Sequence, residues 1–356
     1  MNATANEFRP GLEFDVAALR RYLAQHLAEF ADSFAGPLQV RQFPGGQSNP
    51  TYLLTTAQTR YVLRRKPPGQ LLPSAHAVDR EYRVMRALAQ HSQVPVARTF
   101  LLCQDPAIIG TQFYLMDFVE GRTFWDPCLP DLAAPQRAAV FDAMNAALAQ
   151  LHSVSPQTAG LADFGRSDGY LLRQVSRWSK QYLADELAGR DANMERLIEW
   201  LPQHLPAAEP AAAIVHGDYR IDNLIFHPTE PRVLAIMDWE LATLGDPIAD
   251  FAYHVMMYRM SNASIPGLLG RDLRALGLPS EHDYVQAYCR RRGLPGIADL
   301  DYYLAFCMFR LAAIFHGIRG REVRGTAVSP QARKYAAEVA GMAALGWLQA
   351  QRVSVA

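Results

Sequence analysis

The chain has 356 residues, of which half are hydrophobic and a fifth are charged, and its formal net charge is zero. This length exceeds that of a typical single hydrophobic core and therefore predicts two domains. A neutral chain has no overall attraction for nucleic acid or for a membrane surface, so neither is an expected partner. The composition does not indicate an oligomeric state.

The four cysteines lie far apart in the sequence and form no C-x-x-C pair. Such cysteines are typical of buried thiols in a reducing compartment, and not of disulfides or metal ligands. The N-terminal residues lack the basic and apolar regions of a secretory signal, and no uncharged apolar run is long enough to span a bilayer. The sequence therefore predicts a cytoplasmic protein.

The first third of the chain is predicted to form a small sheet with few helices, from its alternating and helical apolar patterns. The expected elements are a helix at 16–30 after Asp15, strands at 38–43, 51–55 and 60–65, a helix at 77–91, and strands at 99–103 and 111–118. The apolar pattern ends at Glu120-Gly121, so we place a domain boundary there, between residues 1–119 and 120–356.

From residue 134 onward the chain is predicted to be mainly helical. The expected helices are 135–152, 170–187, 193–204, 247–260, 280–292, 300–318 and 329–351, with short strands at 224–226 and 233–237. A small antiparallel-sheet lobe followed by a larger, mainly helical lobe is an α+β, bilobal architecture of the kind found in protein-kinase-like enzymes.

Residues 213–240 carry the most informative pattern, in which two apolar runs follow the tripeptide His216-Gly217-Asp218. Asn223 comes five residues after Asp218, and Asp238 ends the second run. Phosphoryl transfer needs a group that orients or deprotonates the acceptor hydroxyl, and oxygen ligands for Mg²⁺ on the nucleotide phosphates. Asp218 is therefore the candidate catalytic base, and Asn223 and Asp238 are the candidate metal ligands. The tripeptide alone would be an ordinary turn, but its order and spacing with the other residues favour the kinase-like interpretation.

A glycine-containing turn between the first two expected strands is a candidate phosphate-binding loop. Its candidate residues are Gly45, Gly46, Ser48 and Asn49. Backbone N–H groups of such a loop approach phosphate without interference from Cβ atoms. Taken alone, the segment is better explained as a plain hairpin turn, because it does not match G-x-G-x-x-G.

Arg64, in the strand at 60–65, is the candidate cation for the nucleotide phosphates. Protein kinases usually carry Lys there, but Arg keeps the charge and adds a bidentate fork. Arg65 and Lys66 are alternatives, although strand alternation places Arg65 on the opposite face. Glu81, early in the following helix, is expected to pair with Arg64. Its alternative role is that of an ordinary acidic residue in a first helical turn.

The strand at 111–118 is expected to lead into a hinge whose backbone meets an adenine edge. The candidate residues are Asp117, Phe118 and Val119, and Phe118 has the alternative of being a core residue. The sequences D-F-G and A-P-E are missing, and only a short segment separates Asp238 from Asp246. That segment has no room for a long activation loop, so a small-molecule kinase is favoured over a protein kinase.

Three further polar residues are expected to have architectural roles. His152, at the end of a predicted helix, is interpreted as a hydrogen-bonded core histidine. Asp246 is expected to cap the helix that begins at Pro247. Asp250 lies one turn further along and is expected to brace the catalytic loop by a hydrogen bond.

From about residue 41 to residue 345 the chain resembles the aminoglycoside phosphotransferase and choline kinase superfamily, and within it the kinase domains fused to acyl-CoA dehydrogenases. The resemblance rests on the segments FPGGQSNPTYLL, YVLRRKPPG, DREYRVMRAL, FYLMDFVEGRTF, HGDYRIDNLIF and IMDWELATLGDPIADFAYH. It implies ATP and Mg²⁺ as cofactors, a nucleotide-binding N-terminal lobe, and a C-terminal lobe that binds a small-molecule acceptor. Fold and motifs do not fix which acceptor.

The charge of the C-terminal region favours an anionic acceptor. Residues 261–356 contain twelve basic and seven acidic residues, the wrong sign for binding a polycationic aminoglycoside. Arg310, Arg319, Arg321 and Arg324 are expected around a glycine-broken loop at 317–325. We therefore consider a hydroxyacyl-CoA or a hydroxy acid as the acceptor, bound by Arg319, Arg321 and Arg324. A solvated arginine surface is an equally good explanation of these residues.

Two other functions remain open at this stage. One is a non-catalytic nucleotide-binding module that acts through a partner protein, which the intact Asp218, Asn223 and Asp238 disfavour. The other is a kinase for an amine alcohol or an aminoglycoside. A choline-like acceptor needs an aromatic cage or an acidic pocket. Tyr302, Tyr303 and Phe306 are candidates for a cage, although their helical spacing is more typical of a core.

Overall fold

The computed structural model describes residues 7–27, 31–44, 49–69, 76–261, 265–326 and 331–353. The chain divides into two compact units. The first comprises Met1–Thr123 and Asn223–Ala242, and the second comprises Phe124–Asp222 and Thr243–Ala356. The first unit is therefore assembled from two stretches of chain that lie far apart in the sequence.

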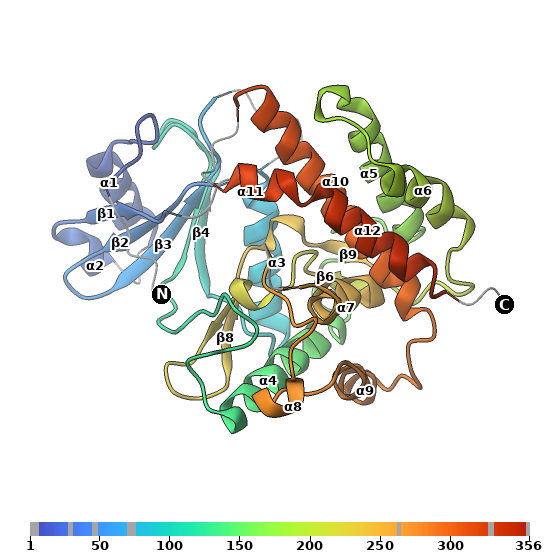
Figure 1. The fold of residues 1–356 in the computed structure, drawn as a ribbon. Coiled ribbons are helices and arrows are strands. Elements are labelled where there is room, and N and C mark those ends of the chain that lie inside the picture. Colours follow the sequence, from blue (N-terminus) through green and yellow to red (C-terminus); the bar gives the residue numbers. More distant parts are fainter. Residues whose placement is uncertain are drawn as a thin grey trace. The chain divides into compact units, whose positions relative to one another are not determined.

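The first unit is built on a five-stranded sheet with the order β1-β2-β3-β5-β4, in which every neighbouring pair is antiparallel (Figure 1). The strands are β1 (Gln39–Gln42), β2 (Thr51–Thr55), β3 (Arg60–Arg65), β4 (Thr99–Cys103) and β5 (Phe113–Asp117). The unit also contains α1 (Val16–His26), α2 (Ala31–Ala35), α3 (Val78–His91) and the hairpin of β7 (Leu224–Phe226) and β8 (Val233–Ile236). The antiparallel-sheet lobe expected from the sequence is confirmed.

Alternation along the strands explains the core of this unit. In β2, Tyr52 and Leu54 are fully buried while their neighbours are only half-buried, as the two faces of a strand require. Leu19 and Leu23 of α1 belong to the same cluster. The Asp15 carboxylate caps α1 by accepting N–H bonds at 2.8 and 2.9 Å. The prediction that this helix reaches residue 30 is wrong, because α1 ends at His26.

The second unit is mainly helical. Its helices are α4 (Ala134–His152), α5 (Tyr170–Ala184), α6 (Ala192–Trp200), α7 (Pro247–Val255), α8 (Leu273–Leu276), α9 (Glu281–Arg292), α10 (Leu300–Val323), α11 (Ala332–Ala337) and α12 (Val339–Ala350). Two short strands, β6 (Ala213–Val215) and β9 (Thr243–Gly245), pair antiparallel. α10 runs through the core and packs against α12 and α7 (Figure 1). The combination of an antiparallel sheet and a helical unit confirms the predicted α+β fold class.

Two helix predictions in this unit are wrong. The loop expected at 317–325 is helical through Val323, because Gly317 and Gly320 serve close packing and do not break the helix. Gly325, with a φ of 70°, follows the end of the helix. A Cβ on Gly320 would lie 1.9 Å from a carboxylate oxygen of Asp185. The single helix expected at 329–351 is two helices, α11 and α12, separated at Glu338, and residues 329 and 330 of that region lie outside the described residues.

Over the ranges that the structure describes, no helix combines the length and the apolar character needed to cross a membrane.

Candidate functional site

The candidate catalytic loop follows β6 and is held by α7. Gly217 has a φ of 83°, a left-handed conformation that glycine adopts at little cost. The Asp250 carboxylate accepts the backbone N–H groups of His216 at 2.7 Å and of Gly217 at 2.8 Å. α7 is itself capped by Asp246, which accepts N–H bonds at 2.8 and 3.2 Å. The expected cap and the expected brace are therefore both present.

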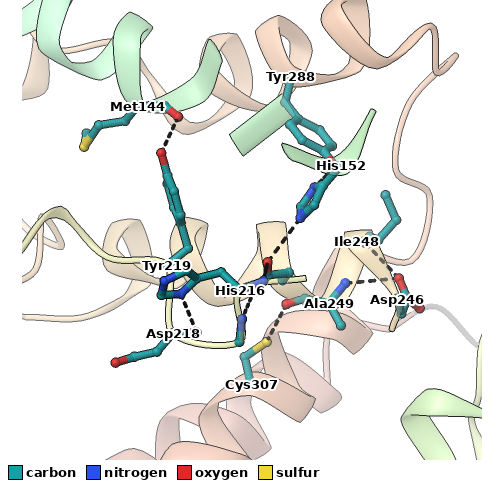
Figure 2. A network of polar contacts seen from close by, with 12 residues as sticks. Met144, His152, His216, Asp218, Tyr219, Asp246, Ile248, Ala249, Tyr288 and Cys307 are labelled. Carbon is teal, nitrogen blue, oxygen red and sulfur yellow. Dashed lines mark hydrogen bonds and ion pairs between the residues drawn. The ribbon is translucent and has the colours of Figure 1, made fainter. Parts of the chain in front are cut away.

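His152 supports this brace from α4. Its Nε2 atom lies 3.1 Å from Oδ2 of Asp250, and its Nδ1 atom lies 2.6 Å from the hydroxyl of Tyr288 (Figure 2). Burial lowers the pKa of His152, against the opposing effect of Asp250. Burial acts to raise the pKa of Asp250, but the hydrogen bond and charge of His152 hold it below its usual value. His152 is thus the hydrogen-bonded core histidine that the sequence predicts.

Asp218 and Tyr219 point to different surroundings. The Tyr219 hydroxyl donates to the carbonyl oxygen of Met144 at 2.9 Å inside the core (Figure 2). The Asp218 side chain is 28% exposed. Its Oδ1 atom accepts the hydroxyl of Tyr253 at 2.8 Å and lies 4.0 Å from Nε of Arg220. The candidate base therefore accepts a hydrogen bond from a buried hydroxyl and has the guanidinium of Arg220 nearby.

A cleft opens beside this carboxylate, within the second unit. Its volume is about 480 Å³, which includes the open mouth. Its polar lining includes Arg220 and Tyr253, the two residues that accompany Asp218. Most of the remaining wall is apolar, with residues such as Trp125, Met256, Met257, Met260 and Leu311. Sequence reasoning missed this cleft, although Met256, Met257 and Met260 lie close together in the sequence, and methionines form adaptable apolar surfaces of the kind that bind apolar groups.

In the first unit, Arg64 makes two close ion pairs. Its Nε atom lies 2.7 Å from Glu81, and its Nη2 atom lies 2.7 Å from Asp238. Glu81 also accepts Nδ2–H of Asn49 at 2.7 Å and the hydroxyl of Tyr114 at 3.0 Å. The predicted pairing of Arg64 with Glu81 is confirmed. Arg65, as expected, lies on the other face, where it donates to the hydroxyl of Tyr52.

Burial and the neighbouring opposite charge shift the pKa values of Arg64 and Glu81 in opposite directions. Burial acts to lower the pKa of Arg64, but the carboxylates of Glu81 and Asp238 outweigh it and raise that pKa. Burial raises the pKa of Glu81, against the opposing effect of Arg64. Because Glu81 is almost fully buried, it depends on Arg64, Asn49 and Tyr114 to remain an anion.

The two candidate metal ligands lie at the same end of the β7–β8 hairpin. Leu224 pairs with Ile236, so Asn223 and Asp238 lie at neighbouring positions just beyond that pair. The Asn223 carbonyl accepts the N–H of Met237 at 2.8 Å, which closes this end of the hairpin. Asp238 has a φ of 62° and its side chain is 44% exposed. A non-glycine residue is uncommon in this conformation, and Asp tolerates it better than most.

The remaining candidates for nucleotide binding are distributed as follows. Gly45, Gly46 and Ser48 lie outside the described residues, whereas Asn49 is buried and donates to Glu81. Asp117 ends β5, and its N–H donates to the carbonyl of Arg98 at 2.9 Å. Phe118 and Val119 are half-buried. The Arg60 guanidinium lies 4.3 Å from the centre of the Phe118 ring, so Phe118 is not a core residue.

The four arginines in α10 and at its C-terminal cap have different surroundings. Arg324 forms two hydrogen bonds of 2.8 Å with Asp185. Arg310 is buried and donates to the carbonyl of Gly217 at 2.6 Å, so grouping it with the exposed arginines was wrong. Arg319 and Arg321 lie on the same helix, outside the lining of the cleft. A substrate role for Arg319, Arg321 and Arg324 stays a prediction.

The aromatic residues considered for a choline-like cage are core residues. Tyr302, Tyr303 and Phe306 are each at most 3% exposed. The Tyr302 hydroxyl donates to the Leu201 carbonyl, and the Tyr303 hydroxyl donates to Asp246. These three buried side chains are therefore not placed to form a cage for a ligand.

A model of the phosphotransferase enzyme family matches residues 39–294 of the chain. Among curated proteins, acyl-CoA dehydrogenase family member 10 of Mus musculus is 46% identical over 93% of this chain and 30% of its own length. Acyl-CoA dehydrogenase family member 11 of Gallus gallus is 42% identical over 98% of this chain and 45% of its own length. The chain therefore spans less than half the length of these curated relatives.

Solved structures give the same picture of the fold. A crystal structure from Ralstonia eutropha, provisionally named an aminoglycoside phosphotransferase, is 46% identical, with a TM-score of 0.87 over 96% of this chain and 100% of that one. A mutant of aminoglycoside phosphotransferase APH(4)-Ia, in complex with AMP-PNP and hygromycin B, has a TM-score of 0.59 at 15% identity, over 94% of this chain and 99% of that one. The second likeness concerns the fold alone.

Proposed function

Since the chain belongs to the phosphotransferase enzyme family and is a small-molecule phosphotransferase of the kinase type, we propose that it transfers the γ-phosphoryl group of ATP to the hydroxyl of an anionic acceptor. The acceptor class is a hydroxyacyl-CoA or a hydroxy acid. The observation that carries this proposal is the position of Asp218 beside a cleft whose wall contains both Tyr253 and Arg220.

The proposed chemistry at Asp218 is that of a general base. Its carboxylate accepts the proton of the acceptor hydroxyl as the hydroxyl oxygen attacks the γ-phosphorus, and ADP leaves. Arg220 lies 4.0 Å from Asp218, so its positive charge also acts on the acceptor hydroxyl and on the phosphoryl group that it attacks. We assign residues 1–119 to nucleotide binding and residues 120–356 to catalysis and acceptor binding, with the segment 223–242 contributing from the first unit.

The side-chain oxygens of Asn223 and Asp238, just beyond the Leu224–Ile236 pair of the β7–β8 hairpin, fit Mg²⁺. Asn223 and Asp238 offer an amide oxygen and a carboxylate at neighbouring positions. Mg²⁺ is usually held by one or two such protein ligands, with phosphate oxygens and water as the others. When bound there, the ion would neutralise charge on the nucleotide phosphates. Among the described residues no cluster of three or more His, Cys, Asp or Glu side chains is placed to hold a metal, so this mixed pair is the candidate.

We assign phosphate binding to Arg64, which Glu81 orients. The other residues that we assign to the nucleotide are Gly45, Gly46, Ser48 and Asn49 for the phosphates, and Asp117, Phe118 and Val119 for the adenine edge. ATP is supported by the fold neighbour that was solved with AMP-PNP. Because another neighbour of the same fold was solved with GDP, GTP belongs in the same assay.

The cleft supports an acceptor that is part apolar and part anionic. Its wall of Trp125, Leu311 and methionines suits a hydrocarbon segment, and Arg220 supplies a cation near the reacting end. Arg220 is itself ion-paired with Asp222, which lines the same cleft, so the case against a polycationic aminoglycoside rests on the excess of basic residues in 261–356. The names of the relatives, acyl-CoA dehydrogenase family members 10 and 11, favour a hydroxyacyl-CoA among the anionic acceptors. Arg319, Arg321 and Arg324 are then candidates for anionic groups further from the hydroxyl.

The test is Mg²⁺-dependent release of ADP in the presence of single acceptors. The panel contains kanamycin, choline, homoserine, hydroxy acids, and hydroxyacyl-CoAs with the hydroxyl at different carbons. We expect stimulation by the last two classes, and its loss in Asp218→Asn, which should still bind ATP. Stimulation by kanamycin or choline alone would refute the acceptor class. Nucleotide binding without stimulation by any acceptor would favour the non-catalytic module.

A double variant tests the more distant arginines. Arg321→Ala with Arg324→Ala should raise the KM for the acceptor and leave the KM for ATP unchanged. Because Arg324 is paired with Asp185, the control is Asp185→Asn, which breaks the same ion pair and keeps the arginine. An unchanged acceptor KM in the double variant would contradict the assignment of Arg321 and Arg324.

A further inference from the structure

Tyr253 both donates a hydrogen bond to the candidate base and lines the cleft beside it. Its hydroxyl donates to Oδ1 of Asp218 at 2.8 Å, and its residue surface is 3% exposed. Burial raises the pKa of Tyr253, and the nearby charge of Asp218 raises it further. The hydroxyl therefore keeps its proton, and it acts toward Asp218 as a donor only.

α7 holds the catalytic loop at two points. Asp250 and Tyr253 are three residues apart, so they lie on one face of the helix. Asp250 accepts the two backbone N–H groups that precede Asp218, and Tyr253 donates to the side chain of Asp218 itself. Backbone and carboxylate are thus fixed to the same rigid element, which is how a reacting group is held in a productive geometry.

Arg310 packs against the aromatic ring of Tyr253. This buried side chain of α10 donates to the carbonyl of Gly217 at 2.6 Å. Its guanidinium lies 5.1 Å from the centre of the Tyr253 ring and 5.9 Å from that of Trp178. A desolvated guanidinium over an aromatic face is a favourable arrangement. The ring of Tyr253 extends from α7 and packs against Arg310 of α10. Its hydroxyl therefore has little freedom to turn away from Asp218.

We propose that Tyr253 is a positioning residue for phosphoryl transfer, whose hydroxyl orients the carboxylate of Asp218 toward the cleft. The inference rests on the proposed function of Asp218 as the base. It assigns no direct contact between Tyr253 and the transferred phosphoryl group. Tyr253 acts through Asp218, and Arg310 acts through Tyr253 and the Gly217 carbonyl.

The variant that isolates this role is Tyr253→Phe, which keeps the ring, the contact with Arg310 and the wall of the cleft. Because Asp218 is partly exposed, water can replace the lost donor, so the variant is expected to fold. The matched control is Tyr258→Phe, which removes a buried hydroxyl that donates to the Pro279 carbonyl at 3.2 Å, away from the cleft lining.

The first readout is structural and does not depend on turnover. In crystal structures of the full chain, we expect the Asp218 carboxylate to have one orientation in the wild type, with Oδ1 within hydrogen-bonding distance of Tyr253. In Tyr253→Phe we expect the carboxylate to be rotated or divided between two orientations. An unchanged carboxylate in Tyr253→Phe would overturn the inference, whatever the activity of the enzyme.

The second readout is kinetic, with Mg·ATP and each hydroxyacyl-CoA of the panel, and with water as the acceptor in their absence. We expect Tyr253→Phe to lower kcat about ten- to a hundredfold, since small displacements of a reacting group have effects of this size, and to leave both KM values within about twofold. Tyr258→Phe should keep the wild-type kcat. A kcat within twofold of the wild type, or a loss confined to the acceptor KM, would overturn the positioning role. Loss of turnover in Asp218→Asn, measured alongside, tests the proposed function separately.

Discussion

The strongest prediction of pH-dependent stability concerns Asp246, the cap of α7. Its Oδ1 atom accepts two backbone N–H groups, its Oδ2 atom accepts the hydroxyl of Tyr303 at 2.9 Å, and the residue is 2% exposed. Burial raises the pKa of Asp246 from 3.8 to about 6, against the opposing effect of these donors. The folded protein therefore binds the proton more tightly than the unfolded chain does.

This difference sets the sign and the size of the effect. The contribution of Asp246 to stability is fully present below pH 4 and is lost as the pH rises through 6. At about 1.4 kcal/mol per pH unit, ionisation of Asp246 costs about 3 kcal/mol at pH 8 and about 1 kcal/mol at pH 4.5. Asp246→Asn removes the charge and keeps an oxygen that caps α7, since Asn is as good an N-cap as Asp.

The assay is urea unfolding of the wild type and of Asp246→Asn, followed by circular dichroism between pH 4.5 and pH 8. The free energy of unfolding of the variant, minus that of the wild type, should be about 2 kcal/mol larger at pH 8 than at pH 4.5. Tyr303→Phe is the companion variant, and it should steepen the loss of stability with pH because Asp246 loses a donor to its charged form. A difference that is constant with pH, or that falls toward pH 8, would refute the reasoning.

Three further predictions use chemical denaturation. Arg64→Met should lower the free energy of unfolding by about 3–5 kcal/mol, because Glu81 remains buried without its cation; a wild-type midpoint would contradict this. Gly121→Ala would place a Cβ 2.3 Å from a carbonyl oxygen of β7 and should cost about 1–3 kcal/mol, whereas Gly36→Ala, with nothing within 4 Å, should not. Burial lowers the pKa of His254 to about 4. The contribution of neutral His254 to the free energy of unfolding is therefore fully present above pH 6.5 and is lost as the pH falls toward 4. In His254→Gln the free energy of unfolding should lack this loss, which is about 3 kcal/mol in the wild type.

Local patterns with fixed spacing predicted the parts of the site that depend on neighbouring elements. Arg64 and Glu81 meet because a strand and the helix after it bring one face of each together. Asp246 caps α7 and Asp250 braces the catalytic loop, and both roles follow from the positions of these residues at the start of α7. For Asp218, Asn223 and Asp238 the order of residues predicted candidates, and their roles stay proposals until the variants are measured.

Other features depend on tertiary contacts that no local pattern contains. The extension of α10 past Gly320 follows from the close approach of Asp185, more than a hundred residues earlier in the chain. The cleft joins residues near 125, 220, 256 and 311, so its apolar character is not visible in any one segment. Arg310 was grouped with exposed arginines because nothing in its helical position distinguishes a buried cation from a solvated one.

The composition of the first unit has a consequence for protein synthesis. Asp238, which pairs with Arg64, lies 174 residues further along the chain. At roughly 5–20 residues per second, about 10–35 s pass between the emergence of Arg64 from the ribosome and that of Asp238. During this interval Arg64 has Glu81 as its local carboxylate, while the rest of its ion-pair partners are still unmade. A fragment that stops near residue 120 would reproduce that nascent state and lack the β7–β8 hairpin.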